Sequence, residues 1–148
     1  MGLNYHVEEA KAGVLLVNDE SDECFGVIHV KASIAGRRQN DQNFSLALLK
    51  KNYFLPFMTM GCKSTPSEWP INKGEFGDTL GKNDSRIDKR KEFEEEGYFS
   101  GCYSYNKNTK QTPNTQKATS RIYQLDFNDP NDIFSKNVIL ARDRLFKG

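Results

Sequence analysis

The sequence predicts one α/β or α+β domain, in which helices cover a sheet. The predicted elements follow an order of strands, a loop and a helix, further strands and a final helix, which is typical of these classes. A length of 148 residues suits one domain and is short for two. The 10 Phe, 6 Tyr and 1 Trp residues supply the apolar side chains that a folded core needs. No run approaches the roughly 20 apolar residues of a membrane-spanning helix, which argues against a membrane protein.

Four apolar segments stand in the first half of the chain. Residues 12–17 form a short apolar run before a polar turn and predict a buried strand. Residues 25–34 alternate imperfectly between apolar and polar side chains and predict a half-buried strand. Residues 44–49 fit a strand or a helix. Residues 53–60 contain Pro56, which favours an edge strand or a loop.

The middle of the chain predicts a long loop that leads into a helix. Glycine and proline interrupt residues 61–84, and an irregular segment of this length is usually functional or partly disordered. Asp84 or Ser85 could cap a helix that runs to about residue 96, where Gly97 would end it.

The last third of the chain predicts two strands and a helix. Residues 98–105 read as a strand, and residues 119–127 show the clearest alternation in the sequence. Apolar side chains then recur at helical spacing from Ile133 to Leu145, which predicts a C-terminal helix.

The charged residues nearly cancel, but they are unevenly distributed. There are 21 Lys and Arg against 20 Asp and Glu, so a formal net charge of +1 argues against a protein that coats a polyanion by bulk charge. Acidic residues gather at 8–23 and 88–96, whereas 31–63 and 101–125 are basic. Three widely spaced cysteines and no apolar leader indicate reduced thiols and a cytoplasmic protein.

The helix expected at 85–96 places several carboxylates on one face. Glu92 neighbours Asp88, Glu95 and Glu96 at spacings of three and four residues. Their repulsion, and the unfavourable position of anions at a helix C-terminus, would be relieved by a divalent cation. Mg²⁺ prefers such oxygen ligands. The alternative is a solvated acidic surface that neighbouring cations balance, namely Arg86, Lys89, Arg90 and Lys91.

Two segments resemble the signature box of the Nudix hydrolases. Residues 69–76 (WPINKGEF) look like the run that leads into the box, and residues 91–98 (KEFEEEGY) look like the end of its helix. Residues 11–17 are similar to the opening strand of that family. The resemblance implies a Nudix-like α/β/α sandwich with a mixed sheet, a box helix at 85–96 and a C-terminal helix. It also implies a single domain over 1–148, with the irregular loop at 61–84 leading into the box helix.

The resemblance implies Mg²⁺-dependent hydrolysis, with Mn²⁺ as an alternative ion, of a pyrophosphate bond in a nucleoside diphosphate derivative or related compound. Glu92, Glu95 and Glu96 would hold the metal, and Glu95 or Glu96 would help to deprotonate the attacking water. The residues that would bind the substrate are Lys73, Gly74, Glu75 and Lys91. Lys91 stands where the family has an arginine.

Two other functions stay open. The basic zones at 31–63 and 101–125 also contain aromatic residues, a combination that suits a single-stranded nucleic-acid-binding protein of OB-like fold. Asn83 stands where the family's first box glutamate belongs, which suits a Nudix-like interaction module without catalysis. The expected partner is a small phosphorylated substrate. A nucleic-acid partner is disfavoured, a membrane is not expected, and the oligomeric state stays open.

Overall fold

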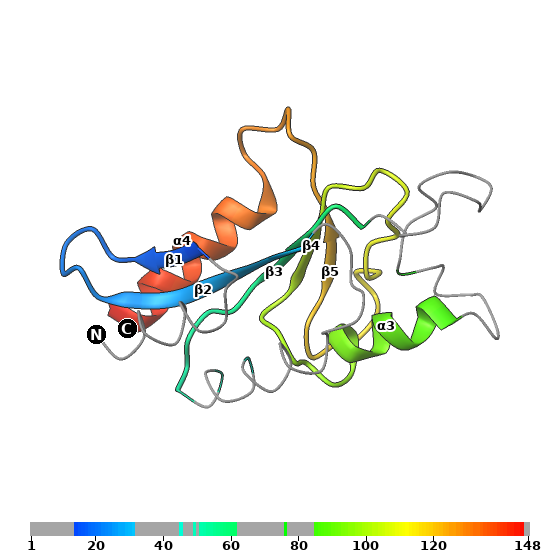
Figure 1. The fold of residues 1–148 in the computed structure, drawn as a ribbon, viewed down its shortest axis with the longest axis horizontal. Helices are drawn as coiled ribbons and strands as arrows, with labels where there is room; N and C mark the ends of the chain where they lie inside the picture. Colours follow the sequence, from blue (N-terminus) through cyan, green and yellow to red (C-terminus); the bar gives the residue numbers. More distant parts are fainter. Residues whose placement is uncertain are drawn as a thin grey trace.

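A computed structural model of the protein describes residues 14–31, 45, 49, 51–61, 76 and 85–146, with the side chains of 85–88 left out. Among these residues, five strands form one sheet in the order β1-β2-β3-β4-β5, and helices α3 and α4 lie against it (Figure 1). The strands and helices are β1 (Val14–Val17), β2 (Cys24–Lys31), β3 (Phe57–Thr59), α3 (Ser85–Glu94), β4 (Cys102–Ser104), β5 (Ile122–Gln124) and α4 (Ile133–Phe146).

The sheet is mixed, with one antiparallel pair and three parallel pairs. β1 and β2 form an antiparallel hairpin, whereas β2, β3, β4 and β5 run parallel to one another. The register aligns the last residues of the four parallel strands, which are Lys31, Thr59, Ser104 and Gln124. We call this side of the sheet the carboxyl edge, and the side where β3, β4 and β5 begin the amino edge.

The hairpin and its close contact with the next segment depend on residues with special backbone properties. Asp22 adopts a positive φ of 57° in the turn, a conformation that Asp tolerates better than most residues. Gly26 in β2 faces the chain that precedes β3, and a Cβ there would lie 2.2 Å from the carbonyl oxygen of Phe54. Glycine therefore permits β2 to approach the backbone at Phe54.

The two helices cover opposite faces of the sheet. Consecutive residues of a strand point to opposite faces, and Cys102 and Tyr103 are consecutive in β4. Cys102 belongs to the same buried cluster as Phe93 of α3. The Tyr103 hydroxyl accepts a 2.8 Å hydrogen bond from Asn137 Nδ2 of α4. In Figure 1, α4 accordingly runs along β1 and β2, and α3 lies beside β5.

The largest buried cluster is aromatic and lies on the α3 face. Its members are Phe57, Phe76, Phe93, Phe99, Cys102 and Ile122. The Phe57 ring centroid lies 5.5 Å from that of Phe93 and 5.0 Å from that of Phe99, in edge-to-face geometry. On the α4 side, Phe25 and Phe54 pack with Ala141.

Much of the predicted architecture is confirmed. The sheet is mixed, and the C-terminal helix forms at 133–146. The strands expected at 12–17 and 25–34 are present as β1 and β2 over their described residues. Ser45 and Leu49 are helical, which decides the open choice at 44–49 in favour of a helix for these two residues.

The prediction of an edge strand or loop at 53–60 was wrong. β3 is a central strand, paired with β2 on one side and β4 on the other. Pro56 lies just before β3, where its carbonyl accepts a 2.9 Å hydrogen bond from the His29 amide. Proline lacks the backbone N–H donor but keeps the carbonyl acceptor. Because only its carbonyl bonds to β2 here, the hydrogen-bond ladder between the strands stays intact.

The helix and strands of the second half are shorter than the patterns suggested. α3 ends at Glu94 rather than at 96, and Gly97 terminates it with a φ of +63°. β4 and β5 occupy three residues each within the expected 98–105 and 119–127.

Of the loop expected at 61–84, only Gly61 and Phe76 are among the described residues. The single-domain organisation over 1–148 stays a prediction. Neither α3 nor α4 is long and apolar enough to span a membrane.

Candidate functional site

Side chains and backbone groups join the ends of β3 and β4 at the carboxyl edge. The Ser104 and Thr109 hydroxyls are 2.7 Å apart, and Asn106 Nδ2 donates a 3.1 Å hydrogen bond to the Gly61 carbonyl. The Gly61 amide in turn donates to Thr59 Oγ1 at 2.9 Å. These buried bonds hold the ends of β3 and β4 in one fixed arrangement, because each polar group would be costly to leave unsatisfied.

Backbone bonds extend this arrangement to β5. The Tyr105 amide donates to the Thr59 carbonyl at 3.0 Å, and the Leu125 amide donates to the Ser104 carbonyl at 2.7 Å. Gly61 has a φ of +61°, and a Cβ there would lie 2.8 Å from Ser104 Oγ. The chain therefore turns away from β3 by a path that glycine permits.

Basic side chains surround this rigid edge. Lys31 closes β2 in register with Thr59 and Ser104, so it lies at the same edge. The chain between β4 and β5, residues 105–121, contains four cations and no carboxylate. Lys107 and Lys110 are exposed in the part of this segment that follows β4. Asp126 and Asp129, in the segment that follows β5, are also exposed at this edge, so the attraction for anions such as phosphate groups is local to the lysines.

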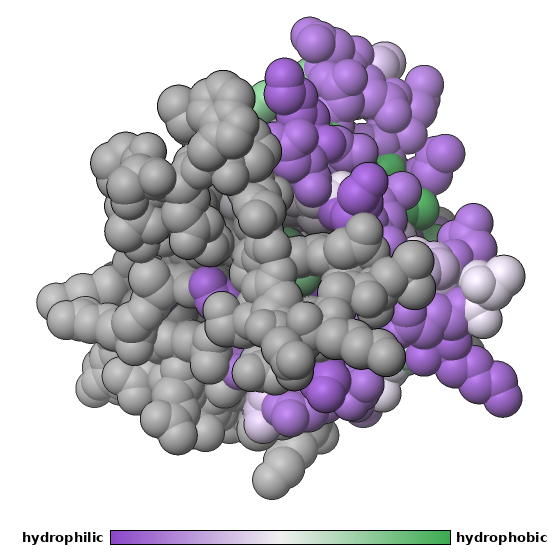
Figure 2. Space-filling view, turned by 90° about the vertical axis from the view of Figure 1, so that its right-hand side faces the viewer, coloured by the Kyte–Doolittle hydropathy of each residue, from purple (hydrophilic) through white to green (hydrophobic). Residues whose placement is uncertain are grey.

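The side of the molecule that carries α3 and the segment between β4 and β5 is hydrophilic (Figure 2). Figure 2 looks onto the side that is at the right in Figure 1, where α3 and the segment between β4 and β5 lie. The described residues visible there are mostly hydrophilic, with few apolar patches. The surface on this side is therefore polar, and it includes the exposed carboxylates Glu95 and Glu96 beyond the end of α3 as well as lysines.

A buried ion pair on α3 holds the segment between β4 and β5. Arg90 Nη2 and Glu94 Oε1 are 2.7 Å apart, and the two residues are only 1% and 6% exposed. Arg90 Nη1 also donates to the Lys110 carbonyl at 2.7 Å. The guanidinium therefore joins α3 to the backbone beside an exposed lysine.

Glu94 holds the same segment through its other contacts. Its carboxylate accepts hydrogen bonds from Thr112 Oγ1 at 2.7 Å and from Gln116 Nε2 at 3.2 Å. Thr112 Oγ1 also accepts a 2.8 Å bond from the Ile122 amide of β5. Because α3, the basic segment and β5 share this network, the cations of residues 105–121 are displayed on a fixed backbone.

The sequence predicted different roles for this helix. Glu95 and Glu96 lie beyond the end of α3 and are exposed, and Lys91 is exposed in its last turn. Glu92 is half-buried on α3. Within the described ranges, no group of three His, Cys, Asp or Glu side chains is placed to hold a metal ion. Lys73, Gly74 and Glu75 lie outside the described residues.

Sequence reasoning missed the two residues that organise this region. Arg90 was expected among solvated cations, but it is buried and paired with Glu94. The four-residue spacing of Arg90 and Glu94 was a usable signal, because it places the two charges next to each other on a helix. Their burial depends on the segment between β4 and β5, which no local pattern indicates.

Comparison with known proteins shows a clear similarity to one restriction enzyme. No protein-family model matches the chain. The type II restriction enzyme AgeI from Thalassovita gelatinovora is 33% identical over 122 residues, which cover 79% of this chain and 42% of that protein. The crystal structure of the restriction endonuclease AgeI in complex with DNA superimposes with a TM-score of 0.72 at 28% identity. That match covers 85% of this chain and 45% of the solved one.

The chain spans less than half the length of the relatives that it matches. These matches overturn the resemblance to Nudix hydrolases, together with the pyrophosphate hydrolysis that the resemblance implied. They also contradict the expected small phosphorylated substrate, because the similar structure contains DNA. The OB-like alternative was wrong in its fold, since the sheet is largely parallel and carries helices on both faces. The nucleic-acid partner of that alternative agrees with the comparisons better than the small phosphorylated substrate does.

Proposed function

We propose that this protein takes part in sequence-specific hydrolysis of phosphodiester bonds in double-stranded DNA, as a relative of the type II restriction enzymes. The observation that carries the proposal is the likeness to AgeI, at 28% identity and a TM-score of 0.72 over 85% of the chain. The roles that the Nudix resemblance assigned to the glutamates of α3 and to Lys73, Gly74, Glu75 and Lys91 are not carried into this proposal.

The carboxyl edge is the proposed place of contact with the DNA backbone. Ligands of open α/β sheets bind beyond the carboxyl ends of the parallel strands, where the loops converge. Lys31, Lys107 and Lys110 supply positive charge on that side of the sheet. DNA phosphates attract such cations. Binding releases the counterions that otherwise surround the phosphates, so the affinity for DNA falls as the salt concentration rises.

Lys31 is the residue that we propose to contact the scissile phosphate. In the last aligned row of the four parallel strands it is the only cation, beside Thr59, Ser104 and Gln124. An ammonium group at a phosphodiester stabilises the negative charge that develops on the phosphate oxygens as water attacks. The short, hydrogen-bonded strand ends beside it would keep that group in position.

Mg²⁺ is the proposed cofactor, because type II restriction endonucleases typically use it. The described part of the chain does not by itself supply a set of metal ligands: no group of three His, Cys, Asp or Glu side chains is assembled there. The mechanism proposed for the described residues is therefore limited to holding the phosphate and stabilising its charge.

A cleavage assay tests the proposal directly. The full chain is incubated with plasmid DNA and Mg²⁺, and discrete fragments that disappear with chelator are expected. Lys31→Gln should lower the cleavage rate by at least tenfold, and Lys136→Gln on the exposed side of α4 serves as the matched control. Random degradation, or a rate unchanged by Lys31→Gln, would contradict the proposal.

DNA binding without cleavage is the second candidate function. It is favoured by the exposed Lys107 and Lys110, which can hold DNA phosphates without taking part in cleavage. Fluorescence anisotropy with a labelled duplex distinguishes the two functions. Salt-dependent binding without any Mg²⁺-dependent fragments would support this second candidate, and no binding would exclude both.

A further inference from the structure

Phe127 is a large apolar side chain that the fold leaves in water at the carboxyl edge. It is 71% exposed and lies in the segment between β5, which ends at Gln124, and α4. Its ring stacks on that of Tyr105, the residue that follows β4, with the ring centroids 3.9 Å apart and an angle of 6° between the planes. The two rings therefore form one aromatic unit that joins the segments after β4 and β5.

This aromatic unit continues a row of exposed apolar side chains. Val30 lies one residue before the last aligned row of the parallel strands, and Met60 and Tyr105 lie one residue after it. Because consecutive residues point to opposite faces, these three side chains share the face on which Tyr103 meets α4. Val30 is 48% exposed and Met60 is 41% exposed. An exposed apolar row of this kind, with Phe127 at its end, is typical of a contact surface for another molecule.

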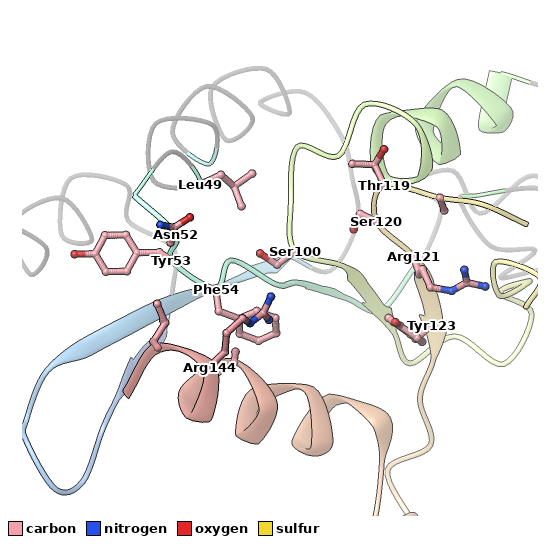
Figure 3. A pocket seen from close by; sticks show the side chains of 13 residues that line it. Leu49, Asn52, Tyr53, Phe54, Ser100, Thr119, Ser120, Arg121, Tyr123 and Arg144 are labelled. Carbon is pink, nitrogen blue, oxygen red and sulfur yellow. The ribbon is translucent and has the colours of Figure 1, made fainter. Parts of the chain in front are cut away.

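The cavity of about 710 Å³ at the amino edge has a different character (Figure 3). Ser100 and Arg121 line it. The Arg121 guanidinium donates at 3.1 Å to the carbonyls of Thr112 and Gln116, and Ser100 Oγ accepts from the Leu55 amide at 2.8 Å. These polar groups hold the backbone of neighbouring segments, so a partner finds more unused surface at the carboxyl edge.

Hydrogen bonds fix the backbone on both sides of Phe127. Asp126 Oδ1 accepts from the Asn128 amide at 2.9 Å, and the Asp126 carbonyl accepts from the Asp129 amide at 3.1 Å. Asp129 Oδ1 accepts in turn from the Asn131 amide at 2.9 Å. Together with the aromatic stack, these bonds hold the ring in one position, so little side-chain freedom remains to be lost when a partner binds.

The charges around the two rings indicate which part of DNA each segment can meet. The charged residues within five positions of either ring are Asp126, Asp129, Asp132, Lys107 and Lys110. Asp126 and Asp129 are exposed near Phe127 and repel phosphate groups there, whereas the two lysines attract them on the neighbouring segment. A carboxylate can still accept hydrogen bonds from the exocyclic amino groups of bases. The segment that carries Phe127 therefore suits contact with bases, and the lysines suit contact with the backbone.

We infer that Phe127, supported by Tyr105, inserts between neighbouring base pairs of the bound DNA. This inference rests on the proposed DNA-binding function and names the residue that deforms the duplex. Apolar side chains inserted at a base step partly unstack the bases and kink the duplex. Lys31, Lys107 and Lys110 hold phosphate groups in the same complex, while the ring occupies the opened step.

Fluorescence of 2-aminopurine in a duplex tests this inference, because the emission of this base rises when its stacking is disrupted. The duplex carries the DNA site that the plasmid fragments identify or, where nothing is cleaved, the site that a footprint identifies. 2-Aminopurine replaces each purine in turn, and chelator prevents cleavage. At saturating protein, emission should rise at least threefold at one position. Binding without a rise at any position overturns the inference and leaves the DNA proposal intact, whereas absence of binding overturns both.

Two variants and one control connect the rise to the ring. Phe127→Ala should abolish the rise and weaken binding at least fivefold, whereas Phe127→Trp keeps an aromatic ring and should keep the rise. Leu140→Ala removes a 62% exposed apolar side chain from α4 and should change neither quantity. Because Phe127 is mostly exposed, the melting temperature of Phe127→Ala should stay close to that of the unaltered protein, so unfolding would not explain a loss of binding.

Two outcomes with these variants contradict the inference. A rise that persists in Phe127→Ala would show that another residue opens the base step. A change of oligomeric state in Phe127→Ala, with DNA binding and emission unaltered, would assign the apolar row to contact with a second copy of the chain.

Discussion

Arg90 Nη2 lies 2.7 Å from Glu94 Oε1 in the buried contact between α3 and residues 105–121. The pair is more than a contact within a helix, because each partner also bonds the segment between β4 and β5. This relationship determines how the basic residues of that segment are presented at the carboxyl edge.

Replacing Glu94 by Gln should destabilise the protein by about 3 to 5 kcal/mol, because the buried Arg90 guanidinium loses its counter-charge. The free energy of unfolding in urea measures this effect. Glu95→Gln, one residue further along and exposed, is the control and should change stability by less than about 0.5 kcal/mol. Equal effects of the two substitutions would show that the ion pair is not a principal support of the fold.

Gly97→Ala should also destabilise the protein. Gly97 has a φ of +63°, and a Cβ there would lie 2.4 Å from Thr119 Cγ2. The left-handed conformation alone costs alanine about 1 to 2 kcal/mol, and the close contact adds to this cost. The midpoint of thermal unfolding should fall.

The double variant Gly97→Ala with Thr119→Ser separates the two causes. Serine lacks Cγ2 but keeps the hydroxyl that donates to the Glu95 carbonyl. Part of the lost stability should return, and the part due to φ should remain. If Thr119→Ser restores nothing, the steric contact is not a cause of the loss.

Tyr103 should make the protein sensitive to alkaline pH. Burial raises the pKa of its phenol well above the ordinary value of 10.0, so the folded state keeps the proton longer than the unfolded chain does. Its contribution to stability is complete below pH 10 and is lost as pH rises further, because the unfolded state then ionises first.

Urea unfolding at pH 8 and pH 11 measures this dependence. Tyr103→Phe should lower stability at pH 8, where the hydrogen bond from Asn137 is lost, but should reduce the further decline toward pH 11. Tyr53→Phe is the control, and its decline should match that of the unaltered protein. A decline unchanged by Tyr103→Phe would contradict the assignment.

The exposed lysines of the segment between β4 and β5 should govern DNA affinity. Lys107→Gln with Lys110→Gln should weaken binding to any duplex sequence, because phosphate contacts carry no sequence information. The slope of log affinity against log salt should fall by about one for each phosphate contact that is lost. Anisotropy at several salt concentrations checks this outcome.

The control for this pair is Lys89→Gln with Lys136→Gln, which removes the same total charge from the two helices. The slope should then stay close to that of the unaltered chain. An equal fall in both double variants would mean that net charge, and not the position of Lys107 and Lys110, sets the affinity.

Most of the secondary structure could be predicted from the sequence, because each helix or strand produces its own local pattern of apolar residues. The apolar run at 14–17, the alternation in β2 and the helical spacing from Ile133 each reflect a single element and its one partner surface. β3 was misjudged because Pro56 was taken as part of the strand. Whether a proline interrupts a ladder depends on its register with the neighbouring strands, which the sequence does not display.

The functional residues were harder to find, because charge along a chain does not reveal burial. The run of glutamates after Lys91 suggested a metal site, which stays a prediction; Glu95 and Glu96 are exposed, and the carboxylate that joins α3 to the segment between β4 and β5 is Glu94. Glu94 gained its role from Thr112 and Gln116, which are about twenty residues away in the chain.

The sequence by itself determined strands that form a sheet covered by helices and a helix at the C-terminal end, together with a basic segment at 101–125. These features follow from the periodicity and composition of neighbouring residues. Only the tertiary structure decided that Lys31 ends its strand beside Thr59 and Ser104, and that Phe127 stacks on Tyr105. Such groupings join residues far apart in the chain through parallel strand register and side-chain packing, and no local pattern encodes them.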